Sequence, residues 1–163
     1  IAGSPYNGIA LESGPGKAEG WFHEIPIILA WKSDTGRHTS NYIDNVEWKR
    51  MINFSGKAEM YVIGNGEWNN TRWPDLINSA EKFVTNSKLI MDSKRNDLLS
   101  ECSQIIEECG LEEDIIPLLC MLGQSIAIVP KNIHLIKKSE DKISDRLRKN
   151  GFQTIITSLS PNS

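Results

Sequence analysis

The feature that most constrains the fold is an apolar stripe in the second half of the 163-residue chain. Its members recur at spacings of three and four residues, which places them on one side of an α-helix. They are Leu98, Leu99, Cys102, Ile105, Ile106 and Cys109. Gly110 comes next, at the position where glycine commonly ends a helix. This helix therefore needs an apolar surface to cover it, as in a globular domain.

Other local patterns predict strands and further helices. Compact or alternating apolar runs predict strands over 25–31, 42–54, 58–63, 88–91, 125–129, 133–136 and 152–157. Helical spacing and end signals predict helices over 74–84, 112–122 and 139–150, in addition to the one that Gly110 ends. These elements predict an α/β (or α+β) fold with a mixed β-sheet, its strands clustered early and its flanking helices in the second half.

The length suits one domain. Residues 1–20 are rich in glycine and proline and predict a flexible lead-in, 21–158 form the single domain, and 159–163 are a polar tail. The first residue, Ile1, is not methionine, which indicates a fragment or a processed product.

Composition gives an expected location for the protein. The chain is 39% hydrophobic and 24% charged, with a net charge of -3. It has no run of about 18 apolar residues, so we expect no membrane span. Its 3 cysteines are an odd number and lie in the apolar rows of predicted helices. They indicate buried thiols in a reducing, intracellular and most simply cytoplasmic compartment.

One segment has the residue types of a metal-dependent nuclease. On the predicted strand over 42–54, Glu47 and Lys49 share a face because side chains alternate with a period of two. Asp34 or Asp44 is available upstream as a second acid. Carboxylates are the ligands that Mg²⁺ or Mn²⁺ prefers, and a neighbouring lysine can position the attacking water. The alternative interpretation is that Glu47 and Lys49 form an exposed cross-strand charge pair.

This segment resembles the PD-(D/E)XK, or restriction-endonuclease-like, nuclease superfamily over about residues 24–85. The acid-x-Lys strand is Val46-Glu47-Trp48-Lys49, and the following predicted strand, the loop over 64–68 and the helix from Pro74 continue the likeness. The resemblance implies a hydrolase that cleaves phosphodiesters of DNA or RNA. Glu47 and Lys49 would be catalytic, and Asp34, Asp44 and Glu47 would bind Mg²⁺ or Mn²⁺.

A second hypothesis is a non-catalytic domain that binds nucleic acid, a nucleotide or a protein, as part of a larger protein. All 5 tryptophans lie between Trp21 and Trp73, where they could stack on bases or fill a core. The charged residues of 97–114 are all acidic, whereas those of 131–149 are mostly basic. The basic segment could contact phosphates, or the two segments could be solvated helix faces that pair with each other. Arg72, before a predicted helix start, could likewise clamp a phosphate.

Overall fold

A four-stranded antiparallel sheet organises the described part of the chain, which comprises residues 24–33, 44–64, 69–120, 124–133 and 140–159 of a computed structural model. The elements in chain order are β1 (Ile25–Trp31), α2 (Val46–Gly64), the 3-10 turn η2 (Asn70–Arg72), α3 (Trp73–Asn86), the 3-10 turn η3 (Leu89–Met91), α4 (Ser93–Glu108), β2 (Ile115–Leu119), β3 (Ser125–Pro130), α5 (Glu140–Lys149) and β4 (Gln153–Leu159).

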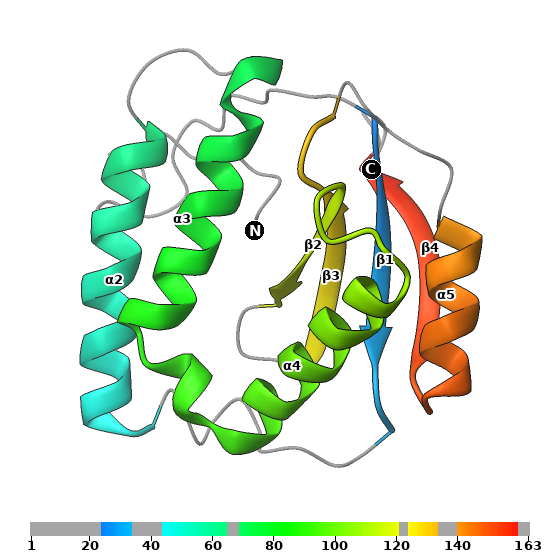
Figure 1. Ribbon diagram of the computed structural model, residues 1–163. Helices are drawn as coiled ribbons and strands as arrows, with labels where there is room; N and C mark the ends of the chain where they lie inside the picture. Colours follow the sequence, from blue (N-terminus) through cyan, green and yellow to red (C-terminus); the bar gives the residue numbers. More distant parts are fainter. Residues whose placement is uncertain (1–23, 34–43, 65–68, 121–123, 134–139, 160–163) are drawn as a thin grey trace.

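The strand order in the sheet is β2-β3-β1-β4 (Figure 1). β1 thus lies in the interior of the sheet, between β3 and β4. Ile28 on β1 lies opposite Ile128 on one side and Ile156 on the other. Because directly opposite residues share a face, this register forms a row of isoleucines across the sheet.

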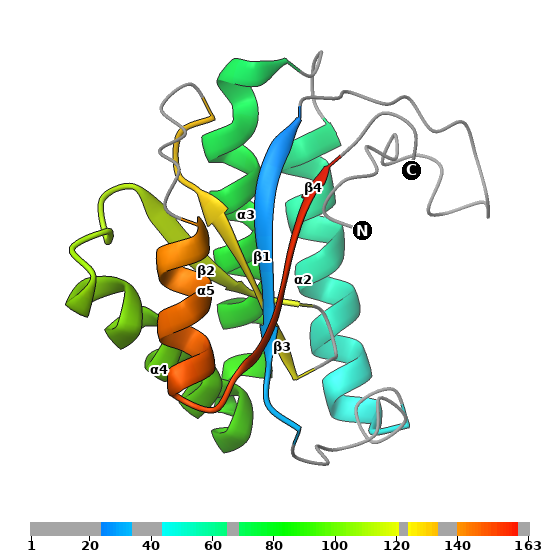
Figure 2. The same cartoon turned by 90° about the vertical axis from the view of Figure 1, so that its right-hand side faces the viewer.

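α4 and α5 cover one face of the sheet, and α3 covers the β2 edge and part of the opposite face. α4 packs on β2 and β3, and α5 packs on β4 and β1. Figure 2 shows both helices on the same side of the sheet. α3 contacts the edge strand β2, and α2 packs on α3, farther from the sheet. The face under α4 and α5 holds the larger core, which includes Ile28, Ile126, Cys102, Ile106 and Leu147. A smaller cluster joins Trp73 and Ile77 of α3 to Ile25 and Val129.

The fold class expected from the sequence is confirmed, with helices and a sheet in one compact domain. The best-patterned elements are also confirmed: strands over 25–31, 125–129 and 152–157, and helices over 74–84, 98–109 and 139–150, the last seen from Glu140. Gly110 has a φ of 67°, the left-handed conformation that glycine adopts readily when it ends a helix.

The strands predicted over 42–54 and 58–63 are wrong, because residues 46–64 form the single helix α2. The side-chain oxygen of Asn45 accepts a hydrogen bond from the backbone N–H of Trp48 at 3.0 Å, which caps the helix start. Trp48, Met51, Ile52, Ser55 and Glu59 then face inward at helical spacing. The apolar residues on the other side of the helix made the sequence resemble an imperfect strand alternation.

Three further expectations need correction. Residues 112–122 contain the strand β2 rather than a helix, and Pro117 is tolerated there because β2 is an edge strand. Residues 88–91 form a 3-10 turn and not a strand. The sheet is antiparallel in every described pairing instead of mixed, and most of its strands come late in the chain. The strand predicted over 133–136 lies mostly outside the described residues.

Within the described ranges, no helix combines the length and the apolar composition that a membrane crossing requires. The three cysteines carry free thiols, and Cys102 is the buried one. Cys109 and Cys120 are partly exposed.

Candidate functional site

The structure does not place Glu47 and Lys49, the two predicted catalytic residues, on the shared face that the predicted strand suggested. Glu47 and Lys49 lie in the first turns of α2 and are exposed, as is Asp44 just before the helix. Side chains two residues apart on a helix point about 200° apart, so Glu47 and Lys49 do not share a face. Asp34 lies outside the described residues. Among the described residues, no cluster of three or more His, Cys, Asp or Glu side chains could hold a metal ion.

Arg72, considered above as a phosphate clamp, binds parts of the protein itself. Its Nε donates to Asp75 Oδ2 at 3.2 Å, and its Nη2 donates to the backbone oxygen of Val62 at 3.2 Å. The second bond satisfies one of the carbonyl groups that the last turn of α2 leaves without a helical partner. Arg72 therefore joins the end of α2 to the start of α3.

The described tryptophans do not form one exposed stacking surface. Trp73 is buried, and its Nε1–H donates to the backbone oxygen of Pro130 at 2.7 Å. Trp31 and Trp48 are half-buried. The other two tryptophans lie outside the described residues. For Trp73, the core-packing interpretation is the one that the structure supports.

The basic helix α5 and the acidic helix α4 pair with each other. Arg146 Nη2 donates to Glu108 Oε2 at 2.7 Å, and Lys142 Nζ donates to the backbone oxygen of Cys109 at 3.2 Å. The hydrogen bonds from Arg146 and, to a smaller extent, from Gln104 lower the pKa of Glu108. On the same helix α4, Glu101 forms an ion pair with Lys32. Acidic residues of α4 thus pair with basic residues of the same chain, Glu108 with Arg146 and Glu101 with Lys32.

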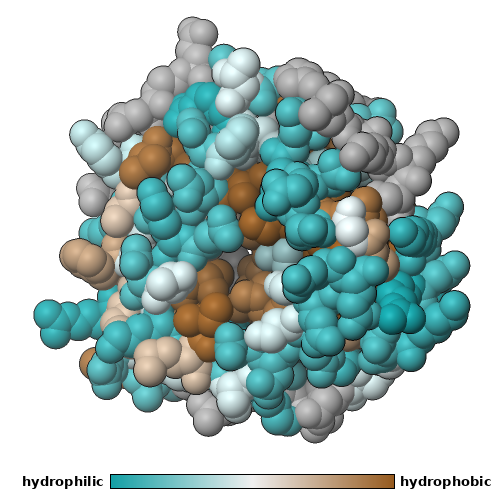
Figure 3. All heavy atoms as spheres, in the orientation of Figure 1, coloured by the Kyte–Doolittle hydropathy of each residue, from teal (hydrophilic) through white to brown (hydrophobic). Residues whose placement is uncertain are grey.

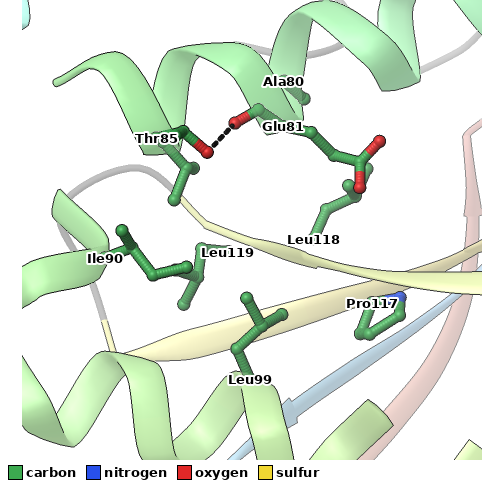
Figure 4. Close-up of a pocket in the computed structure, with 9 residues that line it drawn as sticks. Ala80, Glu81, Thr85, Ile90, Leu99, Pro117, Leu118 and Leu119 are labelled. Carbon is green, nitrogen blue, oxygen red and sulfur yellow. Dashed lines mark hydrogen bonds between the residues drawn. The ribbon is translucent and has the colours of Figure 1, made fainter. Parts of the chain in front are cut away.

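A small pocket of about 100 Å³ lies between α3, α4 and β2 (Figure 4). Its lining is mainly apolar: Ala80, Glu81, Val84, Thr85, Ile90, Leu99, Pro117, Leu118 and Leu119. The Thr85 hydroxyl donates to the backbone oxygen of Glu81 at 3.0 Å, within α3 itself. Figure 3 shows hydrophobic residues gathered over the space between α3 and β2 on this face of the molecule. Pockets for small ligands are usually about 300 to 1,000 Å³, so this hollow is small for that role.

The most unusual exposed surface is the outer face of α2, defined here by Val46, Arg50, Phe54, Lys57 and Tyr61. These residues follow one another at intervals of three or four and point away from α3. The side chains of Val46, Phe54 and Tyr61 are 82%, 77% and 74% exposed. Single exposed apolar residues are ordinary, whereas three in one row on a surface helix indicate an interaction site.

This surface was missed in the sequence because residues 42–54 and 58–63 were assigned to strands. Assignment of 46–64 to one helix would have placed Val46, Phe54 and Tyr61 on one side from their spacing alone. Comparisons with known proteins add no family to this description: no family model matches the chain, and no curated protein shows a significant match to it.

Proposed function

We propose that this domain is a non-catalytic binding module that inserts the outer face of α2 into an acid-rimmed apolar groove on a partner protein. The observation that carries the proposal is the row of Val46, Phe54 and Tyr61, which spans roughly 22 Å at 1.5 Å per residue. Apolar anchors repeated along one side of a helix are the means by which helices bind in protein grooves.

The charges on α2 favour an acidic partner. Arg50 and Lys57 lie between the apolar anchors, and Lys49 flanks them, whereas Glu47 is the one acid beside the row. Aromatic residues and arginine are also the side chains that contribute most to protein interfaces. A groove with an apolar floor and acidic rims would match both the row and its charges.

A protein groove fits this surface better than nucleic acid does. Phe54 and Tyr61 are seven residues apart, or roughly 10 Å, which is too far for neighbouring bases to stack on both. Val46 cannot stack on a base at all. The helix is also a convex surface at the outside of the molecule (Figure 1), whereas single strands are commonly held in a basic groove.

Residue-specific photo-cross-linking tests the proposal. A benzophenone amino acid replaces Phe54 in one variant and Met91, an equally exposed apolar residue outside α2, in the control. We expect a discrete protein adduct from position 54 and not from position 91. Binding of the purified adduct partner to the domain is then measured by calorimetry. We expect the Phe54→Ser/Tyr61→Ser variant to weaken it by about 100-fold or more, and Met91→Ser to leave it within about twofold.

Three outcomes would contradict the proposal. The first is equal cross-linking at the two positions. The second is binding of a labelled oligothymidylate or oligouridylate that the Phe54→Ser/Tyr61→Ser variant abolishes, which would assign the face to nucleic acid. The third is Mg²⁺- or Mn²⁺-dependent cleavage of nucleic acid that Glu47→Ala abolishes. That result would support the nuclease predicted from the sequence instead.

A further inference from the structure

The two edges of the sheet are built differently. β2, at one edge, has Pro117 in its middle and contacts with α3 and α4. Proline removes a backbone donor, and covering helices restrict access, so both features hinder the pairing of another strand there. β4, at the other edge, has neither proline nor any charged residue in its seven positions. In the part of the chain that the structure describes, no strand pairs with its outer side.

The centre of β4 is also apolar and exposed. Ile155 and Ile156 are 52% and 42% exposed, although they lie opposite Leu29 and Ile28 of the sheet interior. α5 packs near the start of the strand, where the Ser144 and Thr154 hydroxyls are 2.6 Å apart. The row of isoleucines from Ile128 through Ile28 therefore ends at Ile156, on an edge that no described strand continues.

We propose that two copies of this chain pair through β4, antiparallel about a two-fold axis at Ile156, to form a continuous eight-stranded sheet. Ile156 is the middle residue of Gln153–Leu159, so this register pairs the whole strand. It places Ile156 opposite its own copy and Ile155 opposite Thr157 of the second copy. Like charges opposite each other would oppose such symmetric pairing, and β4 has none.

The same contrast between edges makes the assembly stop at two copies. Once the two β4 strands are paired, both outer edges of the eight-stranded sheet are β2, with Pro117 and the covering helices. A two-fold contact that uses the same strand of each copy is closed, and so it does not propagate into fibres. A contact centred on one strand pair is at the small end of interface sizes, below about 1,200 Å². We therefore expect a reversible dimer that depends on concentration.

Sedimentation velocity over a concentration series tests the dimer. We expect the full chain to shift from monomer to dimer, and Ile156→Lys to raise the dissociation constant by at least about tenfold. Phe54→Lys, which places the same charge on a more exposed apolar site of α2, should leave the dimer unchanged. Circular dichroism and the melting temperature establish that each variant is folded. A wild-type chain that stays monomeric, an Ile156→Lys variant that dimerises as the wild type does, or species larger than a dimer would overturn the proposal.

Disulfide trapping tests the register. In a Cys109→Ser/Cys120→Ser background, Ile156→Cys places two thiols opposite each other, with Cα atoms about 4.5 to 5.5 Å apart, which a disulfide spans. In the same register, Ser158→Cys puts the two thiols about 13 Å apart. We expect rapid oxidation to a cross-linked dimer at position 156 and slow oxidation at 158. Equal rates would overturn the two-fold axis at Ile156. The proposal does not depend on the role of α2, because Ile156→Lys should retain any partner bound there.

Discussion

Buried hydroxyl groups differ in whether the fold satisfies them. The hydroxyls of Ser144 and Thr154 are 2.6 Å apart and join α5 to β4. Ser55 is buried on the inner side of α2, and its Oγ has no hydrogen-bond partner among the described residues. A buried polar group without a partner keeps the cost of its lost hydration, so the two serines should respond in opposite ways to replacement by alanine.

We expect Ser55→Ala to raise the free energy of unfolding by about 1 kcal/mol, because it removes an unsatisfied buried hydroxyl without a large change in volume. Ser144→Ala should lower it by about 1 kcal/mol, because it leaves the Thr154 hydroxyl without this partner. Urea denaturation of both variants measures the two changes. A loss of stability in Ser55→Ala would show that its hydroxyl has a partner after all.

The thiol of Cys102 lies in the larger core under α4. Burial, with a smaller contribution from the charge of Glu101, raises its pKa from 9.0 to about 12. The folded protein therefore keeps the thiol protonated at a pH where the unfolded chain has lost the proton. Such a group stabilises the fold fully below pH 9, and this contribution decreases as the pH rises from 9 toward 12.

We therefore expect the free energy of unfolding of the wild type to fall above pH 9 more steeply than that of Cys102→Ala. The limiting difference is about 1.4 kcal/mol per pH unit for one proton. Denaturant titrations between pH 8 and the highest pH at which both proteins fold reversibly measure it. Parallel pH profiles would contradict the assignment. At neutral pH, the same burial should protect Cys102 from thiol reagents that label Cys109 and Cys120.

At the scale of elements, the helices and strands whose local signals agree were predicted from the sequence, and α2 was not. α4 has an apolar stripe and a glycine at its end, and β3 is a short apolar run between turns. In α2, apolar residues occur on both the inner and the outer side, so neither a period of two nor one of 3.6 stands out. Packing on α3 decides in favour of the helix.

Substitution of Gly56 tests how closely α2 packs on α3. A Cβ atom at this position would lie 3.7 Å from Cε2 of Phe83 on α3, which is an ordinary contact. Glycine inside a helix is less favourable than alanine by about 0.5 to 1 kcal/mol. We expect Gly56→Ala to raise the melting temperature accordingly. The matched control is Gly110→Ala, which should lower it, because Gly110 has a φ of 67°. Destabilisation by Gly56→Ala would mean that α2 and α3 pack more closely than the structure shows.

At the scale of the whole molecule, contacts between distant segments hold the layers together. The indole of Trp73 donates to Pro130, which is 57 residues away, and so fastens the start of α3 to the end of β3. Arg146 reaches Glu108 across 38 residues and links α5 to α4. The first of these contacts is buried and the second is exposed, so the first should contribute more to stability.

We expect Trp73→Phe to lower the free energy of unfolding by about 1 to 3 kcal/mol, because the ring shrinks and the carbonyl of Pro130 loses its donor. Glu108→Gln should change it by a clearly smaller amount, because water and salt screen an exposed ion pair. Equilibrium unfolding followed by far-ultraviolet circular dichroism measures both. An equal or larger effect of Glu108→Gln would contradict the greater weight given to the Trp73 bond.

The sequence by itself determined the features that arise within one element. They include the apolar stripe of α4, the helix-ending Gly110 and the uncharged composition of β4, since the spacing and chemistry of neighbouring residues suffice for each. The candidate site required the tertiary structure. Residues 46–64 form a helix that packs against α3. In this helix Glu47 and Lys49 do not share a face, and Phe54 and Tyr61 lie on the exposed side. Strand order and the pairing of α4 with α5 are likewise tertiary results, because they depend on which distant surfaces bury one another, and a local pattern does not contain that information.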